Sequence, residues 1–145
     1  MAVFEPDEQI ETLDPAACSR LLAATQVGRL ALVAEGKPKI IVLNHLVYRE
    51  GVFFRTAPDA WLVRHLTDEG PGGGPGLEVV YEVDSASAAG RSGWSVIATG
   101  RLHREDDAEL VALAHRKLEA WAHGDRDVVL RLHVDELTGR RVGPA

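Results

Sequence analysis

Short apolar runs, separated by turn residues, divide most of the chain into segments with the length of β-strands. The runs Val27–Val33 and Lys39–Tyr48 flank Ala34-Glu35-Gly36, which is a typical hairpin signal. The tight turn Arg49-Glu50-Gly51 then leads into a strand over Val52–Thr56. Further strands are predicted over Leu77–Val83, Gly93–His103 and Val128–Val134.

Helices are predicted beside these strands. The first begins with Asp14 as N-cap and Pro15 at the first helical position, and it places Cys18 on its apolar face. Cys18 is therefore interpreted as a core residue rather than a nucleophile. A second, short helix is predicted over Asp59–Leu66, where apolar residues follow at helical spacing.

A third helix is predicted over Asp106–Trp121. Asp106 and Glu109 have the spacing of a capping box, and Gly124 stands where a C-terminal cap is expected. The predicted apolar face of this helix consists of Val111, Ala114, Leu118 and Trp121.

Strands in hairpin order, with helices at the edges, predict the α+β class, mainly β, built as a six-stranded antiparallel barrel with peripheral helices. The glycine-rich segment Gly70–Gly76 lacks the GK[ST] ending of a phosphate loop, so it is interpreted as a surface loop. The polar segment Asp84–Ser92 is interpreted in the same way. Residues 1–12 are expected to form a loose N-terminal arm, and residues 13–145 a single domain.

Composition excludes several classes of function. The formal net charge is −6, and Lys and Arg are scattered, which disfavours nucleic-acid binding. One cysteine and dispersed histidines disfavour a metal site. No apolar run approaches the roughly 20 residues of a membrane span, and the acidic N-terminus is unlike a signal peptide. We therefore expect a cytoplasmic protein without nucleic-acid or membrane partners.

Polar side chains interrupt otherwise apolar strands at three places, which are Asn44-His45, Arg55-Thr56 and Trp94-Ser95. Such groups suit a planar aromatic ligand, and the place where a strand gives way to a helix suits its anionic group. Structural roles stay open at each place. One member of the first pair can simply face solvent, Arg55 can pair with a carboxylate such as Glu82, and Trp94 can belong to the core.

The order of five segments is more specific than any one of them. These segments are LDPAACSRLLAATQVGRLALV, KIIVLNHLVYREGVFFRTAP, EVD at Glu82–Asp84, GWSVIATGRL at Gly93–Leu102, and ELTGRRV. Together they reach from about Leu13 to Val142. In this order they resemble the pyridoxamine 5'-phosphate oxidase-like family of FMN-binding split barrels, and most of all its short, actinobacterial-type members.

The resemblance implies a split barrel that forms a homodimer, with two FMN sites at the interface between subunits. The cofactor-binding positions that it implies are Ile41, Val42, Leu43, Asn44, Arg55, Thr56, Trp61, Trp94 and Ser95. In such proteins the strand of the first four follows the isoalloxazine edge, and the FRT strand end contacts the ring and the ribityl phosphate. The strand that carries Trp94 and Ser95 comes from the partner subunit.

Trp61 is a departure from the family pattern. Short members carry a lysine at this position, where it pairs with the FMN phosphate. The loss of one such cation costs roughly 1–3 kcal/mol of binding free energy. Arg64, about one helical turn further on, is the residue expected to replace it.

The activity that the resemblance implies is that of an FMN-dependent oxidoreductase, which transfers hydride at flavin N5 to or from an unidentified small molecule. The residues themselves assign no catalytic group, although His45 is a candidate proton donor and, alternatively, an exposed strand residue. Two other functions stay open. One is a protein that binds flavin, haem or another planar ligand without turnover, or whose site binds no cofactor, and the other is a reductase that uses a deazaflavin coenzyme.

Overall fold

The computed structural model of the chain describes residues 10–66, 76–119, 121 and 124–143. The strands are β1 (Ile10–Thr12), β2 (Val27–Ala34), β3 (Lys37–Asn44), β4 (Leu46–Tyr48), β5 (Gly51–Thr56), β6 (Leu77–Ser87), β7 (Ser92–Arg104) and β8 (Val128–Val142). The helices are α1 (Pro15–Ala24), α2 (Trp61–Arg64) and α3 (Ala108–Lys117). In this part of the chain no helix has both the length and the apolar character needed to cross a membrane.

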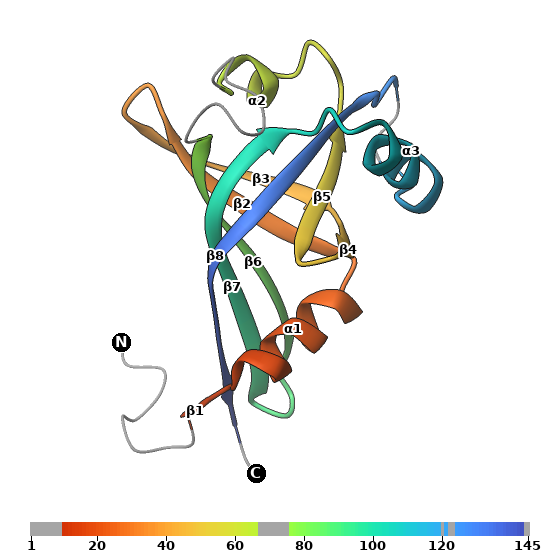
Figure 1. Cartoon of the computed structure of the whole chain (residues 1–145). Helices are drawn as coiled ribbons and strands as arrows, with labels where there is room; N and C mark the ends of the chain where they lie inside the picture. Colours follow the sequence, from red (N-terminus) through yellow and green to blue (C-terminus); the bar gives the residue numbers. More distant parts are fainter. Residues whose placement is uncertain (1–9, 67–75, 120, 122–123, 144–145) are drawn as a thin grey trace.

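The described strands form one antiparallel sheet in the order β3-β2-β6-β7-β8-β5-β4, and β1 pairs with the far end of β8. This sheet curls into a barrel, and α1 and α3 lie beside it on different sides (Figure 1). Its six longer strands are those that the hairpin pattern predicts, while β1 and β4 add only three residues each. The predicted class and the antiparallel barrel with peripheral helices are therefore confirmed.

Strand β8, with 15 residues, pairs with both β7 and β5, and a β-bulge interrupts its pairing with β7. The register shifts between Thr99 and Gly100 of β7, which leaves Asp135 of β8 as the extra residue. A Cβ atom at Gly100 would overlap the carbonyl oxygen of His133. Only glycine therefore permits the close approach of the two strands at this point.

The core fills the inside of the barrel, and a smaller cluster lies under α3. Because successive strand residues point to opposite faces, β5 contributes to both. Phe54 packs edge-on against Tyr81 inside the barrel, with ring centroids 4.9 Å apart, and Phe53 packs outside it against Ala114 of α3. Cys18 of α1 is completely buried in the main core, as predicted.

The N-terminus of α3 differs from the prediction by one residue. Asp107, and not Asp106, is the N-cap, since its Oδ1 accepts the backbone N–H groups of Glu109 and Leu110 at 3.0 Å each. The side chain of Glu109 is therefore not part of the capping box that the sequence pattern indicates. The cap satisfies two of the backbone donors that a helix N-terminus leaves unpaired.

The C-terminus of α3 comes earlier than predicted. The helix ends at Lys117, because the backbone of Leu118 is already extended, with φ −108° and ψ 99°. Trp121 therefore does not continue the apolar face, and it is 62% exposed. Gly124, with φ 97°, belongs to the connection that follows and does not cap the helix.

The polar segment Asp84–Ser92 is not the loop that its composition indicates. β6 continues to Ser87, β7 begins at Ser92, and the two strands stay paired up to the turn between them. The small residues of this hairpin are exposed, so their backbone pairing and not apolar burial keeps them extended. Residues 70–75 of the glycine-rich segment lie outside the described residues.

The remaining differences concern the ends of elements. The predicted strand Lys39–Tyr48 is divided at His45 into β3 and β4, and the second helix is limited to Trp61–Arg64. Part of the predicted N-terminal arm, Ile10–Thr12, pairs with β8, while residues 1–9 lie outside the described residues.

Candidate ligand-binding site

A cavity of about 460 Å³ lies at the seam between the two ends of the curled sheet. β3 and β5 both line it, although four other strands separate them in the strand order. The residues that line this seam cavity are Val27, Ile41, Val42, Leu43, Asn44, Arg55, Thr56, Trp121 and Arg126. The fold thus brings the predicted groups Ile41–Asn44 and Arg55–Thr56 together.

Two of these residues hold the connection between α3 and β8 against the barrel. Asn44 Nδ2 donates to the carbonyl oxygen of Glu119 at 2.6 Å. Arg55 Nη1 donates to the carbonyl oxygen of Leu118 at 2.9 Å, and Arg55 Nε donates to that of Arg126 at 3.0 Å. The alternative in which Arg55 pairs with Glu82 is wrong, because backbone carbonyls take these donors.

The seam cavity combines an apolar wall with a few polar groups. Its aliphatic part comes from Val27 and from Ile41 to Leu43, and the indole of Trp121 adds an aromatic surface. The polar residues that line it are Asn44, Thr56, Arg55 and Arg126. An apolar cavity of a few hundred cubic ångströms with a few convergent polar groups suits a planar organic ligand that carries an anion.

Acidic residues lie close to the cationic end of this cavity but do not line it. Asp125 lies within the electrostatic influence of Arg55 and His115. The neighbouring Asp127 carboxyl raises the pKa of Asp125 above its usual range, and Arg55 and His115 oppose this shift.

Trp94 and Ser95 lie in a different place. They line a cavity of about 540 Å³ along the β6–β7 hairpin, together with Arg91 and Arg140. None of these residues lines the seam cavity of the same chain. Within one chain the fold does not bring Trp94 and Ser95 to Arg55 and Thr56.

Trp61 packs against the main core from α2. Its ring centroid is 4.4 Å from that of His65, and it does not line the seam cavity. Arg64 is exposed and also does not line this cavity. Neither residue therefore supplies the seam cavity with the cation that the resemblance leads us to expect there.

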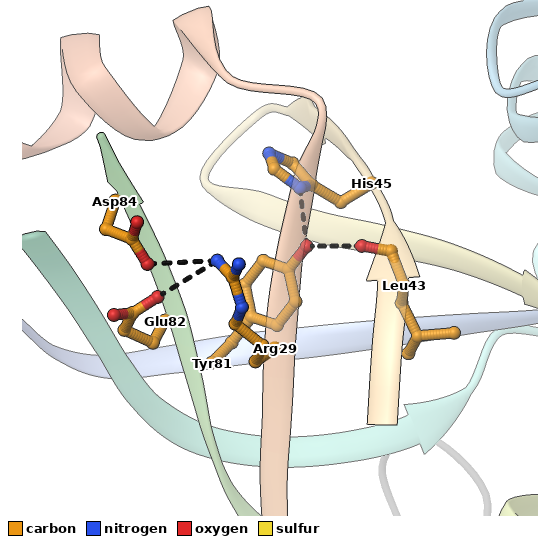
Figure 2. Close-up of polar contacts among 6 residues, drawn as sticks. All are labelled: Arg29, Leu43, His45, Tyr81, Glu82 and Asp84. Atoms are coloured by element: carbon orange, nitrogen blue, oxygen red, sulfur yellow. Dashed lines mark hydrogen bonds and ion pairs between the residues drawn. The ribbon is translucent and has the colours of Figure 1, made fainter. Parts of the chain in front are cut away.

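His45 is neither exposed nor part of the cavity. It is 6% exposed, and its ring lies between α1 and β6 (Figure 2). Nδ1 is 2.6 Å from the hydroxyl oxygen of Tyr81, and Nε2 is 3.1 Å from the carbonyl oxygen of Leu22. Burial lowers the pKa of His45 below its usual value. The structure thus gives His45 a structural role in the core.

A charged cluster lies on the outer face of the sheet next to Tyr81 (Figure 2). Arg29 Nη1 donates to Asp84 Oδ2 at 2.9 Å and is 3.7 Å from Glu82 Oε1. Burial, and after it the neighbouring Asp84 carboxyl, raises the pKa of Glu82 to about 7. Among the described residues, no group of three or more His, Cys, Asp and Glu side chains has the arrangement of a metal site.

Sequence reasoning missed Trp121 and Arg126 as residues of the cavity. Trp121 fits the helical spacing of the preceding apolar residues, which assigns it to a buried helix face. Arg126 stands between two aspartates in a polar segment, where a solvated position is the usual expectation. Only the early end of α3 shows that both residues belong to a connection that returns across the seam.

The comparisons with known proteins agree with this fold. The family model described as pyridoxamine 5'-phosphate oxidase matches residues 14–141. The uncharacterized protein Rv0080 of Mycobacterium tuberculosis is 33% identical over 137 residues, which cover 92% of this chain and 86% of that protein.

Solved structures are similar over nearly the whole chain. The FAD binding protein from Mycobacterium smegmatis is 26% identical, with a TM-score of 0.72 and coverage of 92% of this chain and 98% of that one. A candidate pyridoxamine 5'-phosphate oxidase from Corynebacterium glutamicum shares the fold at 19% identity, with a TM-score of 0.74 and coverage of 97% and 99%. Since the family model matches residues 14–141, the chain belongs to the pyridoxamine 5'-phosphate oxidase family.

Proposed function

We propose that the protein is a cytoplasmic flavoprotein that binds FMN in the seam cavity and acts as an oxidoreductase on a small molecule. The observation that carries this proposal is the convergence of Ile41–Asn44 and Arg55–Thr56 on one cavity of about 460 Å³. The relationship to the FAD binding protein from Mycobacterium smegmatis, at 26% identity, supports a flavin as the ligand.

The residues of the cavity fit the parts of a flavin. The aliphatic side chains of β2 and β3 offer an apolar surface for a flat ring, and Asn44 has an amide for a ring edge. Thr56 and the guanidinium groups offer donors for a phosphate. A bound flavin supplies the redox chemistry by accepting or delivering hydride at N5, so the protein needs no nucleophile of its own.

We also propose that the functional unit is a homodimer. Trp94 and Ser95 line a different cavity from the seam cavity of their own chain, so a second chain is the source from which they could complete it. Exposed aliphatic side chains on the outer face of β2 and β3 support this assembly: Val33 is 63% exposed and Ile40 72%. Large exposed apolar residues that gather on one face are typical of interfaces.

A binding protein without turnover is the second candidate. The observation that favours it is that the seam cavity has no side chain that titrates near neutral pH among the described residues that line it, because His45 is buried elsewhere. Proton transfer during turnover would then depend on water or on the substrate.

Absorbance spectroscopy of the purified protein, with and without added FMN, tests the proposal. We expect flavin bands that remain with the protein through gel filtration, and reduction of the bound flavin by NADH or NADPH. Flavin bands that bleach with dithionite but not with either nicotinamide would favour the binding protein. Failure of FMN, FAD and riboflavin to bind, with binding of a deazaflavin coenzyme instead, would replace the proposed cofactor.

A further inference from the structure

The seam cavity contains a cation that does not come from the helix after β5. Arg126 lines the cavity from the connection between α3 and β8, near the end of that connection and two residues before β8 begins. The position where the family has a lysine is occupied by Trp61, which packs on the core instead. The second arginine of the cavity therefore comes from the connection between α3 and β8, and not from the helix after β5.

Arg55 fixes the place of Arg126. Arg55 Nε donates to the backbone carbonyl oxygen of Arg126 at 3.0 Å, and Arg55 Nη1 donates to that of Leu118 at 2.9 Å. Both ends of the connection are therefore fastened to one side chain of β5. A guanidinium has five N–H groups, so these bonds use two of the donors of Arg55.

The guanidinium of Arg126 itself is half-buried, and within the described residues we find no hydrogen bond or ion pair that engages it. None of its five donors is therefore engaged by a residue that the structure describes, and their planar arrangement suits the oxygens of a phosphate. The neighbouring Asp125 and Asp127 do not line the cavity.

Resting on the proposed function, we propose that Arg126 is the residue that binds the anionic group of the ligand, and that Arg55 is the positioning residue that holds Arg126 in place. The chemistry recognised is a phosphate monoester on a planar ring system. Trp121, on the same connection, adds an aromatic contact.

The test compares FMN with riboflavin, which lacks the phosphate, by quenching of flavin fluorescence. We expect the wild type to bind FMN about ten- to a hundredfold more tightly than riboflavin, the worth of one charge-assisted contact. Arg126→Gln should remove most of this preference and leave the affinity for riboflavin unchanged. Arg126→Lys, which keeps a charge, should retain part of the preference.

Two further variants complete the test. Arg20→Gln removes one positive charge from an exposed position on α1 and should keep the full preference for FMN. Arg55→Gln should weaken the binding of both ligands in the folded protein, because it releases the connection that carries Trp121 and Arg126.

The outcomes separate the two proposals. If the wild type binds neither ligand, the proposed function fails and this inference fails with it. If the wild type prefers FMN and Arg126→Gln has the same preference, the inference is overturned while the proposed function stands. If Arg55→Gln binds both ligands as the wild type does, the positioning role of Arg55 is overturned.

Discussion

At the scale of residues, the contact between His45 and Tyr81 shows how a polar pair is satisfied inside the barrel. Nε2 of His45 faces a carbonyl oxygen and therefore carries a proton. In the neutral imidazole, Nδ1 is then an acceptor 2.6 Å from the Tyr81 hydroxyl, whose single proton is shared between this nitrogen and the carbonyl oxygen of Leu43, 3.0 Å away (Figure 2). One hydroxyl group thus links β6 to Leu43 of β3 and to His45 at the break between β3 and β4.

Removal of this hydroxyl should weaken the fold. Tyr81→Phe leaves Nδ1 of His45 buried without a donor, so we expect a loss of about 1–3 kcal/mol in the free energy of unfolding. Urea denaturation followed by circular dichroism measures this loss. Tyr48→Phe is the matched control, because the Tyr48 side chain is only half-buried and its hydroxyl has no hydrogen bond within the described residues. Equal stability of both variants would contradict the role assigned to Tyr81.

The pKa of Glu82 gives a prediction with a definite sign. Because this pKa is raised from 4.5 to about 7 on folding, the folded state binds more protons than the unfolded state between these pH values. The contribution of Glu82 to stability therefore falls as the pH rises through this window. Its side chain is 33% exposed and solvent screens the effect, so only the direction is predicted.

Thermal unfolding of Glu82→Gln at pH 5 and pH 8 measures this contribution. The variant should gain stability relative to the wild type when the pH is raised from 5 to 8. Glu78→Gln, an exposed position on the same strand, is the control for the removal of one negative charge. A relative stability of Glu82→Gln that does not change with pH would show that Glu82 is ionised throughout.

At the scale of elements, α3 offers a direct comparison between the cap that the sequence pattern indicates and the cap that the structure contains. Asp107→Ala removes the acceptor of two backbone N–H groups, so it should cost about 1 kcal/mol of stability. Asp106→Ala changes an exposed neighbour whose side chain caps nothing, so it should remain within about 0.5 kcal/mol of the wild type. Urea midpoints of the two variants measure the difference, and a larger loss at Asp106 would refute the cap observed here.

Helices and strands were predicted correctly from the sequence where apolar periodicity is strong. The prediction failed where backbone pairing determines the extent of a strand, or where the N-cap determines the start of a helix. The buried run of β5 and the alternation in β2 and β7 identify strands within one residue of their observed ends. The hairpin Asp84–Ser92 has no apolar face to detect, because its strands are held by pairing with each other. At α3, Asp106 and Asp107 are both possible N-cap residues, and only the backbone geometry shows that Asp107 has this role.

Of the candidate site, the sequence predicts only the residues that lie on strands. Ile41–Asn44 and Arg55–Thr56 are interruptions in apolar strands, and the family pattern orders them, so the sequence indicates both groups. Trp121 and Arg126 reach the same cavity through an irregular connection, whose course depends on hydrogen bonds from Asn44 and Arg55. A local sequence pattern does not reveal hydrogen bonds between residues that lie so far apart in the chain.

At the scale of the whole molecule, the exposed outer face of β2 and β3 leads to a prediction about assembly. We expect light scattering to give twice the mass of one 15.7 kDa chain at micromolar concentration. The double variant Val33→Asp, Ile40→Asp should be monomeric, because it introduces two negative charges into the proposed interface. Ile10→Asp, which alters an exposed apolar residue on β1, is the control and should remain dimeric. A monomeric wild type would rule out the proposed homodimer.

The hydrogen bonds across the seam also have a consequence for the kinetics of folding. They join residues that are 75, 63 and 71 positions apart in the chain, so each closes a long loop. Loops of this length form late, after the hairpins whose contacts are local. FMN bound at the seam should therefore slow unfolding and leave the refolding rate almost unchanged, because its site is absent from the transition state. Stopped-flow measurements with and without FMN test this order, and faster refolding with FMN would show that the seam closes early.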